Sequence, residues 1–374
     1  GANVLIGGMR GWWWVWSQCP GVGAVRLSHL RAVARDHGIG PEALWSWPEP
    51  RLAEALPWPR PVLQAVERYR SHLGRHPDLT VPREVLLPCD DAWPVRLDRM
   101  AQPPKLLFRR GRLDLLDCLT SGQAVAVVGT RSASPHGIRM AEDLGHALAR
   151  SGWPVISGLA EGIDAAVHGG CLQADGAPVA VLGTGLDRVY PRHHDALQKA
   201  VAQQGLLISE RSSGEPVQRG HFAHRNRLIV ALASALVVVE CPERSGALIS
   251  ARLAEQRSCP VWVVPGDALR WSARGSNALL QNQAAPLLSA EALVRHLGPG
   301  PLLLHEPEPL PSQLNPERAE QIELLQAMAS GASLEDLSSR LRQSPAALAR
   351  RLLEMERLGR VVCESGYLWR PCRR

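Results

Sequence analysis

The chain has 374 residues, which exceeds the usual size of one domain and predicts two or three domains. Its 45% hydrophobic and 21% charged residues are typical of a folded protein, which excludes a disordered or fibrous chain. No apolar run approaches the roughly 18–20 residues that a membrane span needs. The tryptophan-rich start is too short for a secretory signal. We therefore expect a cytoplasmic protein without a membrane partner.

The eight cysteines are spread over the whole chain, with no C-x-x-C pair and no histidine at ligand spacing. This pattern predicts reduced thiols rather than a disulfide scaffold, and it predicts no metal site. The formal net charge of +6 is a moderate excess. It is compatible with an anionic partner but does not identify one.

Residues 1–84 are predicted to form a small helical module, SAM-like or helix-hairpin-helix-like. Apolar stripes at helical spacing run through residues 25–33 and 63–69, within a helical region that we expect from about residue 17 to 72. The turn Pro20-Gly21-Val22-Gly23 precedes the first stripe. Such a turn can offer backbone N–H groups to a DNA phosphate, and it is equally the turn of an ordinary helical bundle.

Residues 85–297 alternate between short apolar runs and amphipathic stretches. The expected strands are Val125–Val128, Pro154–Ser157, Val179–Leu182, Leu206–Ser209, Ala235–Glu240 and Val261–Val264. The expected helices are Ile138–Arg150, Ile163–Gln173, Asp195–Gln203, Arg225–Ala233 and Ala247–Gln256. This alternation predicts an α/β domain with a Rossmann-like, doubly wound, mostly parallel sheet. Ligands of such sheets bind at the carboxyl ends of the strands, so the segments that follow the strands are the most informative.

Residues 298–316 are rich in proline and are predicted to be a semi-rigid linker. Residues 317–374 contain three helical patterns followed by two short apolar runs around a turn, which predicts a C-terminal winged helix. From residue 340 to the end there are nine arginines against three glutamates. Winged helices bind DNA or other proteins, and both alternatives stay open for this domain.

The segment after the first strand of the alternating region has the features of a phosphate cradle. It reads Gly129-Thr130-Arg131-Ser132-Ala133-Ser134 and leads into a helix at Gly137. Small residues allow an anion to approach the backbone, the helix start offers free N–H groups, and Arg131 adds a forked charge. It is neither a dinucleotide fingerprint nor a Walker A loop. The alternative is a tight turn with only a structural role.

Ser157 and Gly158 follow the second strand and again leave backbone donors near the edge of the sheet. Asp164, in the first turn of the next helix, is expected to cap these donors, and His168 to hold a neighbouring loop by a hydrogen bond, because no nucleophile motif accompanies it. Glu240 ends the fifth strand and is assigned a similar supporting role.

A loop after the fourth strand places Phe222 between basic residues. Base stacking on an aromatic ring, with guanidinium groups on the flanking phosphates, holds single strands without reading their sequence. The alternative is that Phe222 belongs to the core. The complete set of predicted phosphate-binding positions is Gly129, Thr130, Arg131, Ser132, Ser134, Ser157, Gly158, Arg219, Arg225, Asn226, Arg227, Ser245 and Gly246.

Several anion-binding loops along one edge favour a polyanion over a small cofactor, so no cofactor is expected. The pattern contains no paired carboxylates, catalytic triad or metal cluster, which argues against an enzyme.

Together these segments resemble the DNA-processing protein A family (DprA, also called Smf). The matching residues are Val-Val-Gly-Thr-Arg-Ser-Ala-Ser at 127–134, Ser-Gly-Leu-Ala-Glu-Gly-Ile-Asp at 157–164 with His168, Val-Leu-Gly-Thr-Gly-Leu-Asp at 181–187 with Tyr190-Pro191, Ser209-Glu210, Phe222 with Arg225-Asn226-Arg227, Ser245-Gly246 and Val264-Pro265-Gly266. They cover roughly residues 90–285 in the order that the family has.

The resemblance implies a dimeric, non-catalytic protein that binds single-stranded DNA. It further implies loading of the RecA recombinase during natural transformation, with displacement of single-strand-binding protein. By position, Thr130, Arg131 and Ser134 would hold phosphate, Arg219 would supply the basic position before the aromatic residue, and Phe222 would stack on a base.

Two other functions are kept as alternatives. Nucleotide phosphoribohydrolases share this fold group, but the segment Cys241–Ala247 lacks the glycine pair and the following glutamate of their motif. A regulator that binds double-stranded DNA through the winged helix is the other alternative.

Overall fold

A computed structural model describes residues 2–282, 284–303, 316–364 and 367–372. The chain divides into two compact units, Gly1–Ala290 and Glu291–Arg374, and each is described by itself. No helix in the described residues is both long and apolar enough to cross a membrane.

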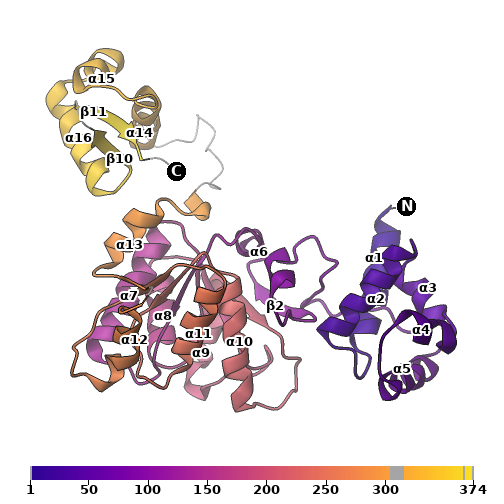
Figure 1. The fold of residues 1–374 in the computed structure, drawn as a ribbon. Helices are drawn as coiled ribbons and strands as arrows, with labels where there is room; N and C mark the ends of the chain where they lie inside the picture. Colours follow the sequence, from indigo (N-terminus) through magenta and orange to yellow (C-terminus); the bar gives the residue numbers. More distant parts are fainter. Residues whose placement is uncertain (1, 283, 304–315, 365–366, 373–374) are drawn as a thin grey trace. The chain divides into compact units, whose positions relative to one another are not determined.

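The first unit begins with a group of helices (Figure 1). The core of this group is rich in tryptophan. The helices are α1 (Ala2–Ser17), α2 (Ala24–Asp36), α3 (Pro41–Ser46), α4 (Glu49–Ala55) and α5 (Arg60–Leu73). The side chain of Trp16 is fully buried, meets the Trp45 ring edge-on with 5.1 Å between ring centres, and donates a hydrogen bond to the carbonyl of Pro41. The sequence prediction began the helical region near residue 17 and missed α1, because its apolar run leaves few polar positions to define a helical period.

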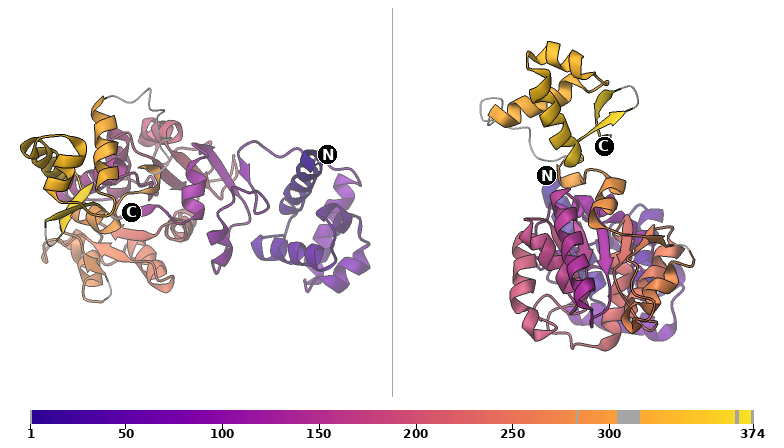
Figure 2. Two further views of the ribbon diagram at one scale, coloured as in Figure 1. Left: turned by 90° about the horizontal axis from the view of Figure 1, so that it is seen from above. Right: turned by 90° about the vertical axis from the view of Figure 1, so that its left-hand side faces the viewer.

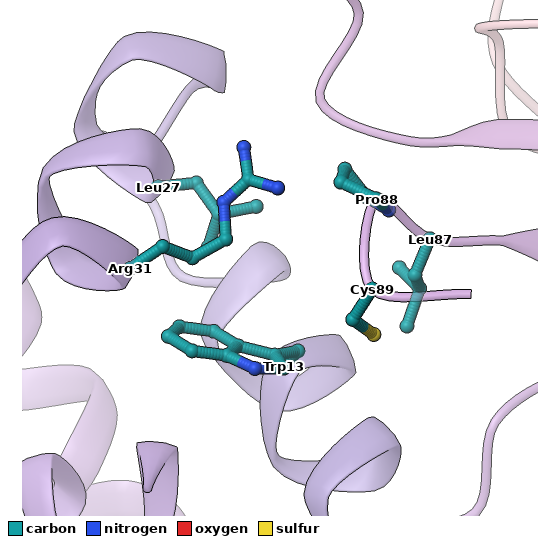
Figure 3. Close-up of a pocket in the computed structure, with 6 residues that line it drawn as sticks. All are labelled: Trp13, Leu27, Arg31, Leu87, Pro88 and Cys89. Atoms are coloured by element: carbon teal, nitrogen blue, oxygen red, sulfur yellow. The ribbon is translucent and has the colours of Figure 1, made fainter. Parts of the chain in front are cut away.

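The segment that leads into the sheet packs against this helical group. Arg10 pairs with Asp90 at 2.6 Å and donates to the carbonyl of Val85 at 2.8 Å. Figure 3 shows the small pocket where the two parts meet. It is lined by Trp13, Leu27, Arg31, Leu87, Pro88 and Cys89. The tryptophan-rich start is therefore part of a packed core.

The main sheet has nine strands within the described residues, in the order β1-β2-β6-β5-β4-β3-β7-β8-β9. They are β1 (Val85–Leu86), β2 (Leu107–Gly111), β3 (Val125–Val128), β4 (Val155–Ser157), β5 (Pro178–Leu182), β6 (Leu206–Ser209), β7 (Ala235–Val238), β8 (Val261–Val263) and β9 (Ala285–Pro286). The neighbours from β6 to β9 are parallel, whereas β2 is antiparallel to both β6 and β1. The expected α/β domain with a mostly parallel sheet is confirmed.

Helices cover both faces of this sheet (Figure 2). The regular helices are α6 (Leu115–Thr120), α7 (Pro135–Arg150), α8 (Ile163–Gln173), α9 (Asp195–Gln204), α10 (Arg219–Ala231), α11 (Gly246–Gln256) and α12 (Arg274–Leu279). Short 3₁₀ turns occur at η1 (Val95–Arg99), η2 (Arg192–His194) and η3 (Trp271–Ala273). Helices α7, α8 and α9 pack side by side, and α10 packs on α11. In the sheet, β3 lies between β4 and β7. The strands that follow β3 in the chain are therefore added first on one side of it and then on the other. Open α/β sheets bind ligands beside such a point.

One helix boundary differs from the sequence prediction in a way that affects the site. Helix α10 begins at Arg219, not at Arg225, so Phe222 lies on the first turn of a helix and not in a loop. The sequence predicts a loop there because the many polar residues and Gly220 show no apolar stripe. Arg219, Phe222 and Arg225 are thereby three residues apart on a helix, which places them on one face.

The second unit begins with α13 (Ala290–Leu297, whose first residue belongs to the first unit) and η4 (Pro301–Leu303). It continues with α14 (Pro316–Ala327), α15 (Leu334–Leu341), α16 (Pro345–Arg357), β10 (Val361–Glu364) and β11 (Leu368–Pro371). The two strands form an antiparallel hairpin. Buried Leu324, Leu337, Leu348 and Leu352 are part of a separate core. Most of the predicted proline-rich linker lies outside the described residues.

Candidate nucleic-acid interface

The segment between β3 and α7 forms a loop that the end of β7 holds in place. The amide of Thr130 donates to the carbonyl of Glu240 at 2.7 Å, and the amide of Ser134 donates to the Glu240 carboxylate at 2.9 Å. The Ser134 hydroxyl accepts from the amide of Gly137 and so caps α7. Glu240 is only 4% exposed, and its hydrogen bonds fix the backbone of the predicted cradle from the inside of the protein.

The segment after β4 is held by a buried carboxylate. Asp164 accepts a hydrogen bond from the amide of Gly158 at 3.1 Å, whereas the start of α8 (Ile163–Gln173) has no side-chain cap. Burial raises the pKa of the Asp164 carboxyl, and the nearby Arg225 opposes that shift. A Cβ atom on Gly158 would lie 2.6 Å from the Arg225 guanidinium carbon, so this position has no space for a side chain. Ser157 is fully buried and donates to the carbonyl of Val127 at 2.6 Å.

Arg225 was predicted to bind phosphate, but the structure places most of it inside the protein. It is 6% exposed, and its Nη1 donates to the carbonyls of Gly158 and Val181, each at 2.7 Å. Burial lowers the pKa of its guanidinium to about 10, against the opposing effect of Asp164. Its contacts join the loop that follows β4 to strand β5, and its side chain lines the bottom of a surface pocket.

His168 is fully buried on α8, one turn after Asp164. Neither of its ring nitrogens has a hydrogen-bond partner among the described residues, so the loop contact expected of it is not observed there. Burial lowers its pKa to about 3, and the nearby Arg225 and His194 act in the same direction. The imidazole is therefore neutral in the folded protein over the physiological pH range.

A pocket open to solvent brings the predicted base-stacking and phosphate-binding residues together. It is lined by Arg131, Gly158, Ala160, Glu161, Tyr190, Pro191, Phe222 and Arg225. The guanidinium carbon of Arg131 lies 5.6 Å from the centre of the Phe222 ring, within cation–π range. The Tyr190 ring lies on Phe222 with 4.9 Å between ring centres. Arg131 is exposed and Phe222 is half-buried, so both remain accessible at the rim.

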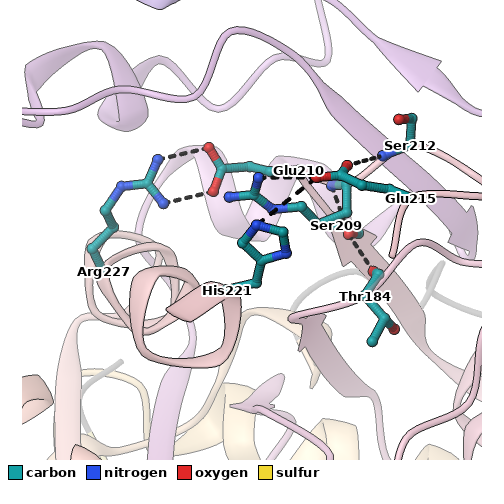
Figure 4. Close-up of polar contacts among 8 residues, drawn as sticks. Thr184, Ser209, Glu210, Ser212, Glu215, His221 and Arg227 are labelled. Carbon is teal, nitrogen blue, oxygen red and sulfur yellow. Dashed lines mark hydrogen bonds and ion pairs between the residues drawn. The ribbon is translucent and has the colours of Figure 1, made fainter. Parts of the chain in front are cut away.

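The remaining basic residues of α10 differ in their availability. Figure 4 shows Arg227 in a two-pronged ion pair with Glu210, with both N–O distances 2.6 Å and both side chains largely buried. Arg227 also donates to the carbonyl of Gln102. Arg219, in contrast, is exposed at the start of the helix. Of these two predicted phosphate contacts, Arg219 has the more accessible charge.

Ser245 and Gly246 begin α11 on the other side of the cradle. The Ser245 hydroxyl accepts from the amide of Ala247 at 3.2 Å and caps the helix. A Cβ atom on Gly246 would lie 3.4 Å from the side-chain nitrogen Nδ2 of Asn226, so α10 and α11 meet at this point. Ser245, Gly246 and Asn226 therefore lie together. Asn226 is linked to the pocket by Arg225, because the Arg225 Nε donates to the side-chain oxygen of Asn226.

Two residues of the site carried no assigned role at the sequence level. Tyr190 gives the pocket a second aromatic ring, and Arg270 donates to the Ser134 hydroxyl at 2.9 Å from the loop after β8. Arg270 is 136 residues from Ser134, so no local pattern could have linked them. Within the described part of the chain, no group of histidine, cysteine, aspartate and glutamate side chains could hold a metal ion.

Comparisons with known proteins point to one family. The family described as DNA recombination-mediator protein A matches residues 84–298. Protein Smf of Synechocystis sp. is 35% identical over 298 residues, which cover 79% of this chain and 74% of that protein. The DNA processing protein DprA of Streptococcus pneumoniae is 37% identical over 202 residues, which cover 54% of this chain and 70% of the relative.

Two solved structures are similar as well. The X-ray structure of DprA from Streptococcus pneumoniae matches with a TM-score of 0.63 and 29% identity, covering 74% of this chain and 94% of that one. A structure of DNA processing protein A from Helicobacter pylori, described as giving insight into its single-stranded DNA binding mode, matches with a TM-score of 0.50 and 31% identity. It covers 55% of this chain and 92% of the other.

Proposed function

This chain belongs to the DNA recombination-mediator protein A family, and from that premise we propose that it binds single-stranded DNA without catalysing a reaction on it. The proposed binding surface is the edge of the main sheet around the pocket of Arg131 and Phe222. The amides of Thr130 and Ser134, which were predicted to hold phosphate, donate instead to Glu240, so these two residues support the loop that carries Arg131. The Helicobacter pylori relative, described by its single-stranded DNA binding mode, supports this proposal.

The observation that carries the proposal is the convergence of Arg131 and Phe222 on one pocket. Arg131 follows strand β3 and Phe222 lies on helix α10, yet the guanidinium carbon lies 5.6 Å from the ring centre. A cation beside a partly accessible aromatic ring can bind a phosphate and a base of the same nucleotide. Neither contact requires a particular base, so we expect binding with little sequence preference.

Titration of a labelled oligonucleotide by fluorescence anisotropy tests this proposal. We expect Phe222→Ala to weaken binding by about 1–3 kcal/mol through lost stacking, and Arg131→Ala to weaken it and reduce the dependence of log K on log salt by about 0.7. Arg150→Ala is the matched control, since this exposed arginine is at the far end of α7. Wild-type affinity in both site variants would contradict the proposal.

The role in recombination is a further part of the proposal and is supported by family membership. We infer a cytoplasmic homodimer that displaces single-strand-binding protein and loads RecA onto incoming strands during natural transformation. The rate at which RecA assembles on strands coated with single-strand-binding protein, with and without this protein, measures that role.

We also propose four functional segments, with the helical module at 1–84, the DNA-binding domain at 85–297, the linker at 298–316 and a winged helix at 317–374. Contact with duplex DNA through the last segment is the second candidate function. It is favoured by exposed Arg350 and Arg357, which are seven residues apart on α16 and therefore share one face of the helix.

A further inference from the structure

Trp271 is exposed, which is unusual for this residue type. Its side chain is 64% exposed, and no other tryptophan in the described residues is classed as exposed. Tryptophan is highly buried on average, because leaving so large an apolar surface in water is unfavourable. Leu269, two residues earlier, is 86% exposed. The loop of residues 265–273, called the Trp271 loop below, therefore presents two large apolar side chains to solvent.

Hydrogen bonds hold the Trp271 loop in a defined conformation. The side chain of Asn277 accepts from the amide of Gly266 at 2.9 Å and donates to its carbonyl at 3.1 Å. The carboxylate of Asp267 accepts from the amide of Leu269, and the amide of Ala273 donates to the carbonyl of Arg270. A ring carried on a fixed loop loses little conformational freedom when it binds a ligand.

The same loop is attached directly to the cradle after β3. Arg270 donates to the hydroxyl of Ser134, and that hydroxyl donates in turn to the buried carboxylate of Glu240. Arg270 thus brings a positive charge above a negative one that would otherwise repel a phosphate. Since Trp271 is the next residue, its backbone lies within about one arginine side chain of the cradle.

We propose that Arg270 and Trp271 form a second nucleotide-binding subsite, in which Trp271 stacks on a further base of the strand that is bound at Phe222. This inference rests on the proposed function and extends its surface across the end of β3 to the loop after β8. As at the pocket of Arg131 and Phe222, an arginine and an accessible aromatic side chain occur in one segment of the site, here as neighbours in the sequence. Asp267 is the nearby carboxylate, and its Oδ1 accepts from the backbone of its own loop.

Oligonucleotides of two lengths distinguish this subsite from the pocket. Oligo-dT of about 6 nucleotides spans one subsite and oligo-dT of about 16 spans both, the range that such grooves cover. We expect Trp271→Ala in the full chain to weaken binding of the longer strand about tenfold and to leave the shorter strand within about twofold. Trp271→Phe, which keeps a ring, should recover most of the loss.

Leu269→Ala is the matched control, because it removes a large exposed apolar side chain of the same loop that has no π-face. We expect wild-type affinity from it at both lengths. Unchanged affinity of Trp271→Ala for the longer strand, while Phe222→Ala weakens both strands, overturns the second subsite and leaves the proposed function standing. If Arg131→Ala and Phe222→Ala also leave the affinity for both strands unchanged, the proposed function itself is contradicted. If Trp271→Ala changes only the mass measured by light scattering, the loop docks a second copy of the chain and the subsite is wrong.

Discussion

Arg225, Asp164 and His168 are polar side chains buried together beneath the Arg131–Phe222 pocket. Arg225 and Asp164 satisfy each other electrostatically and hold backbone groups of the surrounding loops. His168 has no such compensation, because both of its ring nitrogens are buried without a partner. A buried unpartnered polar group costs about 1–3 kcal/mol, so His168 lowers the stability of the fold.

The effect of His168 on stability should depend on pH. Its pKa is about 3 in the folded protein against 6.5 for an ordinary histidine. Below pH 6.5 the unfolded chain therefore takes up a proton that the folded chain cannot, and stability falls by about 1.4 kcal/mol per pH unit towards pH 3. We expect His168→Leu to be at least as stable as the wild type at pH 7 and to gain a growing advantage as the pH is lowered to about 5.

Urea unfolding of both proteins at several pH values measures this advantage. The comparison removes the contribution of Asp164, whose raised pKa acts in the opposite direction in both proteins. A stability difference that stays constant from pH 7 to pH 5 would show that His168 does not remain neutral in the folded chain.

The sequence predicted the accessible residues of the site better than it sorted the buried ones. Small residues and Arg131 directly after an apolar strand form a local pattern, and Phe222 was recognisable beside basic positions. Arg225 and Arg227 have the same chemistry as Arg131 in the sequence. Arg225 donates to the carbonyl of Gly158, and Arg227 pairs with Glu210. These partners lie in other segments of the chain, so only the fold could reveal the contacts.

Helices α7 and α8 approach each other closely enough for their backbones to touch, and each begins directly after a loop of the site. A Cβ atom on Gly170 would lie 2.2 Å from the carbonyl of Glu142, and one on Gly145 would lie 2.2 Å from the carbonyl of Val167. This close packing fixes the spacing between the cradle and the segment of Gly158. Tight helix packing is therefore part of how the site is positioned.

We expect Gly170→Ala to destabilise the protein by about 1–3 kcal/mol, because the added methyl group forces the helices apart. Gly169→Ala is the matched control, since a Cβ atom there meets nothing within 4 Å. The control should be neutral or stabilise the helix by about 0.5–1 kcal/mol. Unfolding midpoints measure both changes, and equal effects of the two substitutions would contradict the close-packing argument.

Elements with strong periodicity were predicted nearly to the residue, whereas those without it were not. Strand β3 and helix α8 have the predicted bounds because an apolar run or stripe continues to both ends. Helix α10 begins six residues before its predicted start. The prediction was wrong there because the first turns of the helix face the site and carry polar residues instead of an apolar stripe. The helix start was therefore obscured by the residues that give the site its chemistry.

The two units divide the positive charge of the chain between two different surfaces. In the first unit, guanidinium groups of the site lie beside an aromatic pocket that suits unpaired bases. In the second, Arg351 and Arg370 pair with Glu320 and Glu364, while Arg350 and Arg357 are exposed on α16. A rigid helix face with exposed arginines suits the regular backbone of a duplex better than a flexible single strand.

The double substitution Arg350→Ala and Arg357→Ala should therefore change duplex binding selectively. Losing two phosphate contacts reduces the salt dependence of duplex binding by about 1.8 in the slope of log K against log salt, and lowers the affinity at low salt. We expect binding of a short single strand to stay within about twofold of the wild type, because that strand occupies the pocket of the first unit. Deleting residues 317–374 should have the same selectivity with a larger loss. Equal loss on single-stranded and duplex DNA would instead place both units on one continuous binding path, and no loss on either would leave α16 free to bind a protein partner.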